Sequence, residues 1–203
     1  MMTRMTQVQG RVRAAAMPLE ERRSAIVAAT LPLFLEQGPG LTTREIAQAA
    51  GIAEGTIFRV FDDKTALLDA VIEAALDPAP TEAALRAIDA DLPLDDRLVA
   101  AVDILRLRVE HVFRVMSAAS GSSATAESAR GRSRSPELPV LVELFASESE
   151  HISREPVEAA RLLRGLAFTG THPSFGGGEP LPSEEIVAVL LDGIRRPAGE
   201  ASC

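Results

Sequence analysis

The chain has 203 residues and a formal net charge of −8 at pH 7, and this length is sufficient to bury a hydrophobic core. It contains no run of about eighteen apolar residues, and residues 1–17 hold no apolar signal core, so we expect a cytoplasmic protein without a membrane span. The single cysteine, Cys203, excludes an intramolecular disulfide and a cysteine cluster for a metal. We expect neither a metal nor a cofactor.

Charge is distributed unevenly along the chain. Residues 1–64 hold eight basic and seven acidic side chains, whereas residues 65–203 hold thirteen basic and twenty-two acidic ones. Because DNA binding depends on the local charge of one face, the near-neutral first part remains able to meet phosphate. Residues 1–18 are expected to form a flexible arm, whose arginines either contact DNA or belong to an ordinary disordered terminus. These arginines are Arg4, Arg11 and Arg13.

Apolar residues recur at helical rather than alternating spacing, which predicts an all-α fold. The first predicted helix spans residues 19–37, and Pro32 inside it should bend it because proline removes one backbone hydrogen bond. Gly38, followed by Pro39, is a typical helix end. The pattern therefore indicates one helix followed by a tight turn.

The next segment carries the most specific local signal in the chain. Thr42 and Glu45 have the spacing of a capping box, which predicts that a short helix begins there. Gly51 can adopt the left-handed conformation that turns the chain into a second short helix over about 53–60. Two short helices joined by a glycine turn predict a helix-turn-helix over about 42–61, whose second helix would lie in the major groove of DNA.

A longer pattern runs from Arg22 to Leu76: Phe-x-x-x-Gly, Thr-Thr, Ile-Ala, Ala-Gly, Gly-Thr-hydrophobic-aromatic, Phe and Lys, in that order. It is carried by Phe34, Gly38, Thr42, Thr43, Ile46, Ala47, Ala50, Gly51, Gly55, Thr56, Ile57, Phe58, Phe61, Lys64 and Leu67. This segment, about a quarter of the chain, resembles the DNA-binding domain of the TetR-type transcriptional regulators. The resemblance implies an N-terminal three-helix DNA-binding domain over 19–77, followed by a helical domain for ligand binding and dimerisation.

Nine residues are candidates for DNA contact, some from the helix-turn-helix geometry and some only from the resemblance. They are Thr42, Thr43, Arg44, Glu54, Gly55, Thr56, Phe58, Arg59 and Lys64. Thr42 is also explained as a helix cap, Arg59 as a solvated surface charge, and Lys64 as half of an ion pair within its helix. Where the family often has tyrosine the chain has Phe58, and where it often has serine or threonine the chain has Ala53, so a phosphate hydrogen bond and a helix cap are missing.

The second domain is predicted over 81–197. A long helix from 94 to 119 carries an apolar stripe, and residues 117–136 are rich in Ser, Gly and Arg, which predicts a flexible loop. Further helices are predicted over about 138–149, 156–169 and 183–195, with a glycine-rich linker before the last. We expect a largely apolar small-molecule effector in this domain. The candidate lining residues are Leu105, Arg108, His111, Val112, Phe113, Met116, Phe145 and Phe168, although such apolar side chains more often belong to the ordinary core and His111 more often to a surface or a satisfied hydrogen bond.

The last two predicted helices are the expected dimer interface, because the final one is apolar on nearly every side and the one before it carries small residues. The candidate interface residues are Ala160, Leu163, Ala167, Ile186, Val187, Leu190, Leu191 and Ile194. In TetR-like proteins such a dimer would place two recognition helices about one DNA turn apart on a near-palindromic operator.

The favoured hypothesis is a ligand-released repressor, in which effector binding moves the helix over 64–76 and separates the recognition helices. A helical dimer that binds a small molecule but no specific DNA is the alternative. An enzyme is not expected, because His111, His151 and His172 lack metal-ligand spacing and no nucleophile motif is present.

Overall fold

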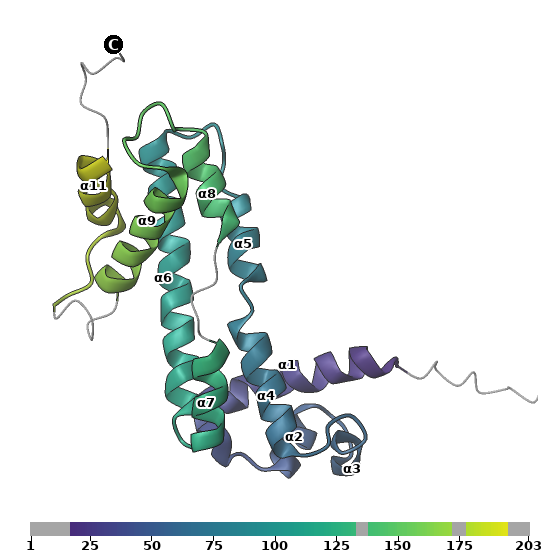
Figure 1. Ribbon diagram of the computed structural model, residues 1–203. Coiled ribbons are helices and arrows are strands. Elements are labelled where there is room, and N and C mark those ends of the chain that lie inside the picture. The colour runs from purple at the N-terminus through teal and green to yellow at the C-terminus, as the bar shows by residue number, and fades with distance from the viewer. Residues whose placement is uncertain (1–16, 133–137, 172–177, 195–203) are drawn as a thin grey trace, which may run out of the picture.

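The computed structural model describes residues 17–132, 138–171 and 178–194, and within these ranges the chain is all-α, as predicted (Figure 1). Its elements are α1 (Leu19–Gln37), the 3-10 turn η1 (Gly38–Gly40), α2 (Thr43–Ala49), α3 (Glu54–Ile57), α4 (Lys64–Leu76), α5 (Ala79–Arg86), α6 (Leu94–Ala119), α7 (Ser123–Arg132), α8 (Pro139–Ala146), α9 (Pro156–Thr171) and α11 (Ser183–Ile194). None of the described helices has the length and apolar character that crossing a membrane requires.

Helix α6 is the axis of the molecule. Figure 1 shows it running from α1 and α7 at one end to α8, α9 and α11 at the other, with α4 and α5 alongside. The helices expected over 19–37, 64–76 and 94–119 have the predicted bounds, whereas α5 was not predicted. Pro32 lies exposed inside α1, and the helix continues past it.

The predicted loop over 117–136 is wrong in the part that the structure describes. Residues Ser123–Arg132 form α7, which packs against α4 and α6. Ala129 is fully buried, and the buried hydroxyl of Thr125 donates to the carbonyl of Ala119 at 2.7 Å. The segment has almost no large apolar residue, so its sequence predicts no core, but two small side chains four positions apart suffice to dock one helical turn. Residues 133–136 lie outside the described ranges, as do residues 1–16 of the predicted arm.

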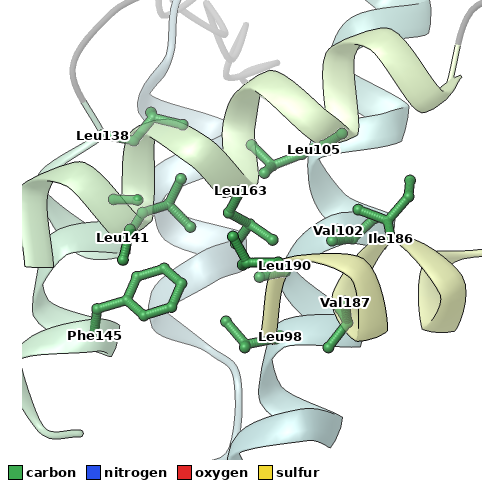
Figure 2. Close-up of a cluster of buried hydrophobic side chains, with 14 of the residues drawn as sticks. Leu98, Val102, Leu105, Leu138, Leu141, Phe145, Leu163, Ile186, Val187 and Leu190 are labelled. Atoms are coloured by element: carbon green, nitrogen blue, oxygen red, sulfur yellow. The ribbon is translucent and has the colours of Figure 1, made fainter. Parts of the chain in front are cut away.

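The buried side chains form two clusters. The C-terminal cluster joins α5, α6, α8, α9 and α11, and Figure 2 shows Leu98, Phe145, Leu163 and Leu190 converging in it. The N-terminal cluster joins the first four helices, but it also includes Val115 of α6. Ala119 and Ala129 complete this second cluster. The N-terminal helices are therefore packed on one end of α6 and on α7, and the core that they form extends past the predicted boundary near residue 77.

Gly38 makes the junction between α1 and α6 possible. Its φ is 64° and its ψ is −153°, a conformation almost restricted to glycine. A Cβ added there would lie 2.8 Å from the carbonyl oxygen of Ala118, so the backbone of α6 leaves no room for a side chain. Gly40, two residues later, has open space around it and no positive φ.

We predict that Gly38→Ala lowers the free energy of unfolding by about 1–3 kcal/mol or more, because it adds backbone strain and a clash with α6. Gly40→Ala is the matched control and is expected to change it by less than about 1 kcal/mol. Urea unfolding followed by circular dichroism measures both. Equal effects of the two substitutions would contradict this account of the junction.

Candidate functional site

The capping box predicted at the start of α2 is present. The Thr42 hydroxyl accepts from the amide of Glu45 at 3.2 Å, and the Glu45 carboxylate accepts from the amide of Thr42 at 2.7 Å. The Thr42 backbone amide, and after it the Thr42 hydroxyl, hold the pKa of Glu45 below its ordinary value. Because the folded-state pKa is lowered, this contribution to stability is present at neutral pH and is lost as the pH falls through that pKa.

Short helix α3 presents an exposed surface beside α2. Its buried residue Ile57 joins the N-terminal cluster, whereas Gly55 and Arg59 are exposed and the Phe58 ring is 51% exposed. Phe58 and Arg59 therefore present an aromatic and a cationic side chain to solvent at the end of α3. Gly51, with φ of 65°, supplies the predicted left-handed turn between the two helices.

Two of the predicted DNA contacts bind each other. The Thr43 hydroxyl donates to the Glu54 carboxylate, which ties the first turn of α2 to the first turn of α3. Arg44 is exposed on α2. Glu54 therefore acts in this structure as a brace of the helix-turn-helix, a role that the sequence alone does not indicate.

Lys64, at the start of α4, has a contact that was not predicted. Its ammonium donates to the carbonyl oxygen of Pro39 at 2.7 Å, in the turn between α1 and α2. The Asp63 carboxylate caps the same helix by accepting from the amide of Ala66 at 2.8 Å. The lysine thus anchors α4 to the turn that precedes the helix-turn-helix, and contact with phosphate stays a prediction.

A cavity of about 420 Å³ lies between α6 and α9. It is lined by Thr81, Leu105, Arg108, Val109, Val112, Leu138, Arg161, Arg164, Gly165 and Phe168. Four of the eight predicted ligand residues are among them, namely Leu105, Arg108, Val112 and Phe168. The cavity falls in the range of about 300–1,000 Å³ typical of small-molecule sites.

The other four predicted ligand residues do not line this cavity. Phe145 is fully buried in the C-terminal cluster, and Met116 packs against the N-terminal one. Phe113 packs against Phe168 with 6.3 Å between the ring centroids. His111 lies with Nε2 2.9 Å from the carbonyl oxygen of Ala75, and since that oxygen only accepts, Nε2 is the protonated nitrogen.

Sequence reasoning missed Arg161 and Arg164, which both line the cavity from α9. On a helix that carries other charged residues, arginines are most simply explained as part of the solvent-exposed face. The available signal was their spacing, because 161, 164 or 165, and 168 fall on one helical face that also carries an aromatic ring.

Arg108 does more than line the cavity, because its guanidinium also binds the C-terminal end of α4. It donates to the carbonyl oxygens of Leu76 at 2.5 Å and Asp77 at 3.1 Å. Burial lowers the pKa of Arg108, and the carboxylate of Asp77 opposes that change. Together with His111, this arginine satisfies carbonyl groups that a helix end leaves without partners inside the helix.

The predicted dimer residues are buried within the single chain, which leaves them little surface for contact with a second copy. All eight are at most 6% exposed and belong to the C-terminal cluster, where α9 and α11 pack on α6. An apolar helix near the end of the chain has the same sequence pattern whether it packs against the core of its own chain or against a second copy of the chain. The exposed apolar side chains of the two helices are instead Val157, Leu162 and Phe168 on α9 and Val189 on α11.

Comparison with known proteins gives one family match, in the N-terminal helices, and a set of solved structures with a similar fold. Residues 26–71 match the family described as bacterial regulatory proteins, tetR family. No curated protein sequence matches the chain significantly.

Solved structures of similar fold cover nearly the whole chain. A Mesorhizobium loti protein described as a TetR-family transcriptional regulator is 15% identical, with a TM-score of 0.64 over 89% of this chain and 100% of that one. A Vibrio parahaemolyticus protein described in the same way is 21% identical, with a TM-score of 0.59 over 87% and 100%. The reduced form of NemR from E. coli is 18% identical, with a TM-score of 0.60 over 87% and 100%. At these identities the likeness shows the fold.

We predict that Thr42→Ala lowers the free energy of unfolding by about 1 kcal/mol, because both arms of the capping box are lost. Thr65→Ala, which removes an exposed threonine in the first turn of α4, is the matched control and is expected to change it by less than about 0.5 kcal/mol. Thermal unfolding followed by circular dichroism tests the pair. A Thr42→Ala variant as stable as the control would show that the box does not hold α2.

Proposed function

We propose that this chain, a TetR-type regulator by its N-terminal domain and its fold, is a ligand-released repressor that binds a near-palindromic operator as a dimer. The observation that carries the proposal is the exposed surface at α3, formed by Gly55 within the helix and by Phe58 and Arg59 directly after its end, beside the buried Ile57. A second short helix fixed in this way is the element that enters the major groove in helix-turn-helix proteins.

Binding to DNA would divide the exposed residues into two roles. Arg59 has the donors to read a guanine edge or to bind a phosphate, and Arg44 is placed on the adjoining helix to contact the backbone. Phe58 lacks a hydroxyl, so it contributes packing against sugar or base rather than a hydrogen bond. Asp62 and Asp63 are exposed nearby and repel phosphate, which favours modest affinity at physiological salt.

The dimer would use the outer faces of α9 and α11. Figure 1 shows α11 beside α9 at the edge of the molecule, away from α4 and α5. Leu162 is 45% exposed and Val189 is 54% exposed, so each helix keeps apolar surface after its inner face is buried. Association of two such helix pairs into a four-helix interface would remove this surface from water and set the spacing of the two α3 helices.

We predict that Arg59→Ala weakens specific DNA binding about tenfold to hundredfold, because one charged contact to base or phosphate is lost. Arg154→Ala, a change at an exposed arginine outside the helix-turn-helix, is the control and should leave the affinity unchanged. Binding is measured by a mobility shift with labelled DNA from upstream of the gene, with nonspecific competitor, at two salt concentrations. If wild type and both variants bind only weakly and without sequence preference, the non-DNA helical dimer becomes the better description.

We predict that Val189→Glu converts the dimer to a monomer at micromolar concentration, because a buried unpaired carboxylate costs about 3–5 kcal/mol at an interface. Leu107→Glu changes another exposed apolar residue, 69% exposed on α6, and should leave the dimer intact. Sedimentation velocity gives the mass of each variant. Dissociation by the α6 substitution alone would place the interface elsewhere.

A further inference from the structure

The cavity between α6 and α9 combines two kinds of surface. Its apolar wall includes Leu105, Val109 and Val112 of α6, with Phe168 opposite them on α9. Its polar wall is cationic, since three arginines line it, Arg108 from α6 and Arg161 and Arg164 from α9. Among the described residues that line it there is no aspartate or glutamate.

Three guanidinium groups around one small apolar cavity are unusual in a chain whose net charge is −8. Arg108 and Arg164 are partly buried and Arg161 is exposed. Arginine guanidinium groups match the geometry of carboxylate and phosphate groups and form charge-assisted hydrogen bonds with them. An uncharged ligand would gain only the apolar wall. An anion with an apolar body would use both walls.

Arg108 is also the group that holds α4. Its guanidinium donates to the carbonyl oxygens of Leu76 and Asp77, which are neutral acceptors, while the Asp77 carboxylate interacts electrostatically with its charge. A ligand's acid group is a stronger acceptor for the same donors, because the charge on both partners contributes. The two bonds use one N–H of each terminal nitrogen of Arg108. A ligand whose acid group takes these same two donors as a bidentate pair therefore displaces the end of α4, the helix that follows the helix-turn-helix.

We propose that the effector is a small amphipathic anion, with an apolar body against α6 and Phe168 and an acid group among the three arginines, and that it acts by drawing Arg108 away from the C-terminal end of α4. That this cavity is the effector site rests on the proposed function. The negative charge of the ligand and its competition with α4 for Arg108 are additional to that function. The conformation with a released α4 end binds the anion better, so the differential affinity that a population shift requires follows from this single arginine.

Ligand binding is tested first without DNA, by isothermal titration calorimetry of the full chain. The probes are decanoate, 4-butylbenzoate and decyl phosphate, with 1-decanol and 4-butylbenzyl alcohol as neutral counterparts. We expect at least one of the three anions to bind at least about tenfold more tightly than its neutral counterpart. The affinities of the three anions should differ with the shape of the apolar body and with the acid group. Binding of the alcohols with equal affinity, or of no anion, would overturn the proposal.

Three single substitutions separate the roles of the arginines. Arg161→Ala should weaken anion binding about tenfold and leave DNA affinity unchanged, because this residue lines the cavity and is not one of the groups that bind the end of α4. Arg108→Ala should weaken both, because the end of α4 is then released without ligand. Arg114→Ala, at an exposed arginine of the same helix outside the cavity, should change neither.

The competition for Arg108 has its own readout in hydrogen exchange. In wild type, the bound anion should speed exchange of the amides in the last turn of α4, residues 73–77, and Arg108→Ala should show the fast rate with no anion present. An anion that binds but slows exchange in this segment would contradict the capture of Arg108. Anion binding with the expected exchange, but no specific DNA binding, would sink the proposed repressor and leave this inference standing.

Discussion

The hydrogen bonds from α6 to the end of α4 are the interaction on which the arrangement of the molecule depends. Helix α4 begins three residues after Phe61, so its axis determines where the helix-turn-helix sits. Lys64 fixes its first turn to Pro39, and Arg108 and His111 bind the carbonyl groups of its last turn. Because side chains hold α4 at both ends, a displacement at one end can be transmitted along the helix to the other.

Packing extends this connection beyond the hydrogen bonds. Val115 and Ala119 belong to α6, which reaches the C-terminal cluster through Leu98 and Leu105, yet both are buried among the N-terminal helices. Helix α7 adds Ala129 to the same cluster and covers α4. Close-packed protein interiors do not deform continuously, so the proposed ligand between α6 and α9 would act on the position of α4 through a few discrete contacts.

Local signals explain why much of the N-terminal half was predictable. The capping box, Gly51 and the helix end at Gly38 are each determined by backbone chemistry within a few residues, and all three are present in the structure. Helix α7 was missed for the opposite reason, since it is held by small side chains that give no hydrophobic pattern. The cavity arginines were missed because Arg161 and Arg164 have the spacing of an ordinary solvated face until α6 is placed against them.

By itself the sequence determined the all-α class, the helix-turn-helix and the bounds of the longest helices, because hydrophobic period and capping act over short stretches of chain. Only the tertiary structure decided which partner each apolar face takes. Leu190 and Leu191 have the pattern of a subunit interface but lie in the chain's own core, and Arg108 has the pattern of a surface charge but caps α4. Apolar residues at helical spacing specify that one face of a helix is buried. Which surface covers that face depends on how helices distant in the sequence pack together.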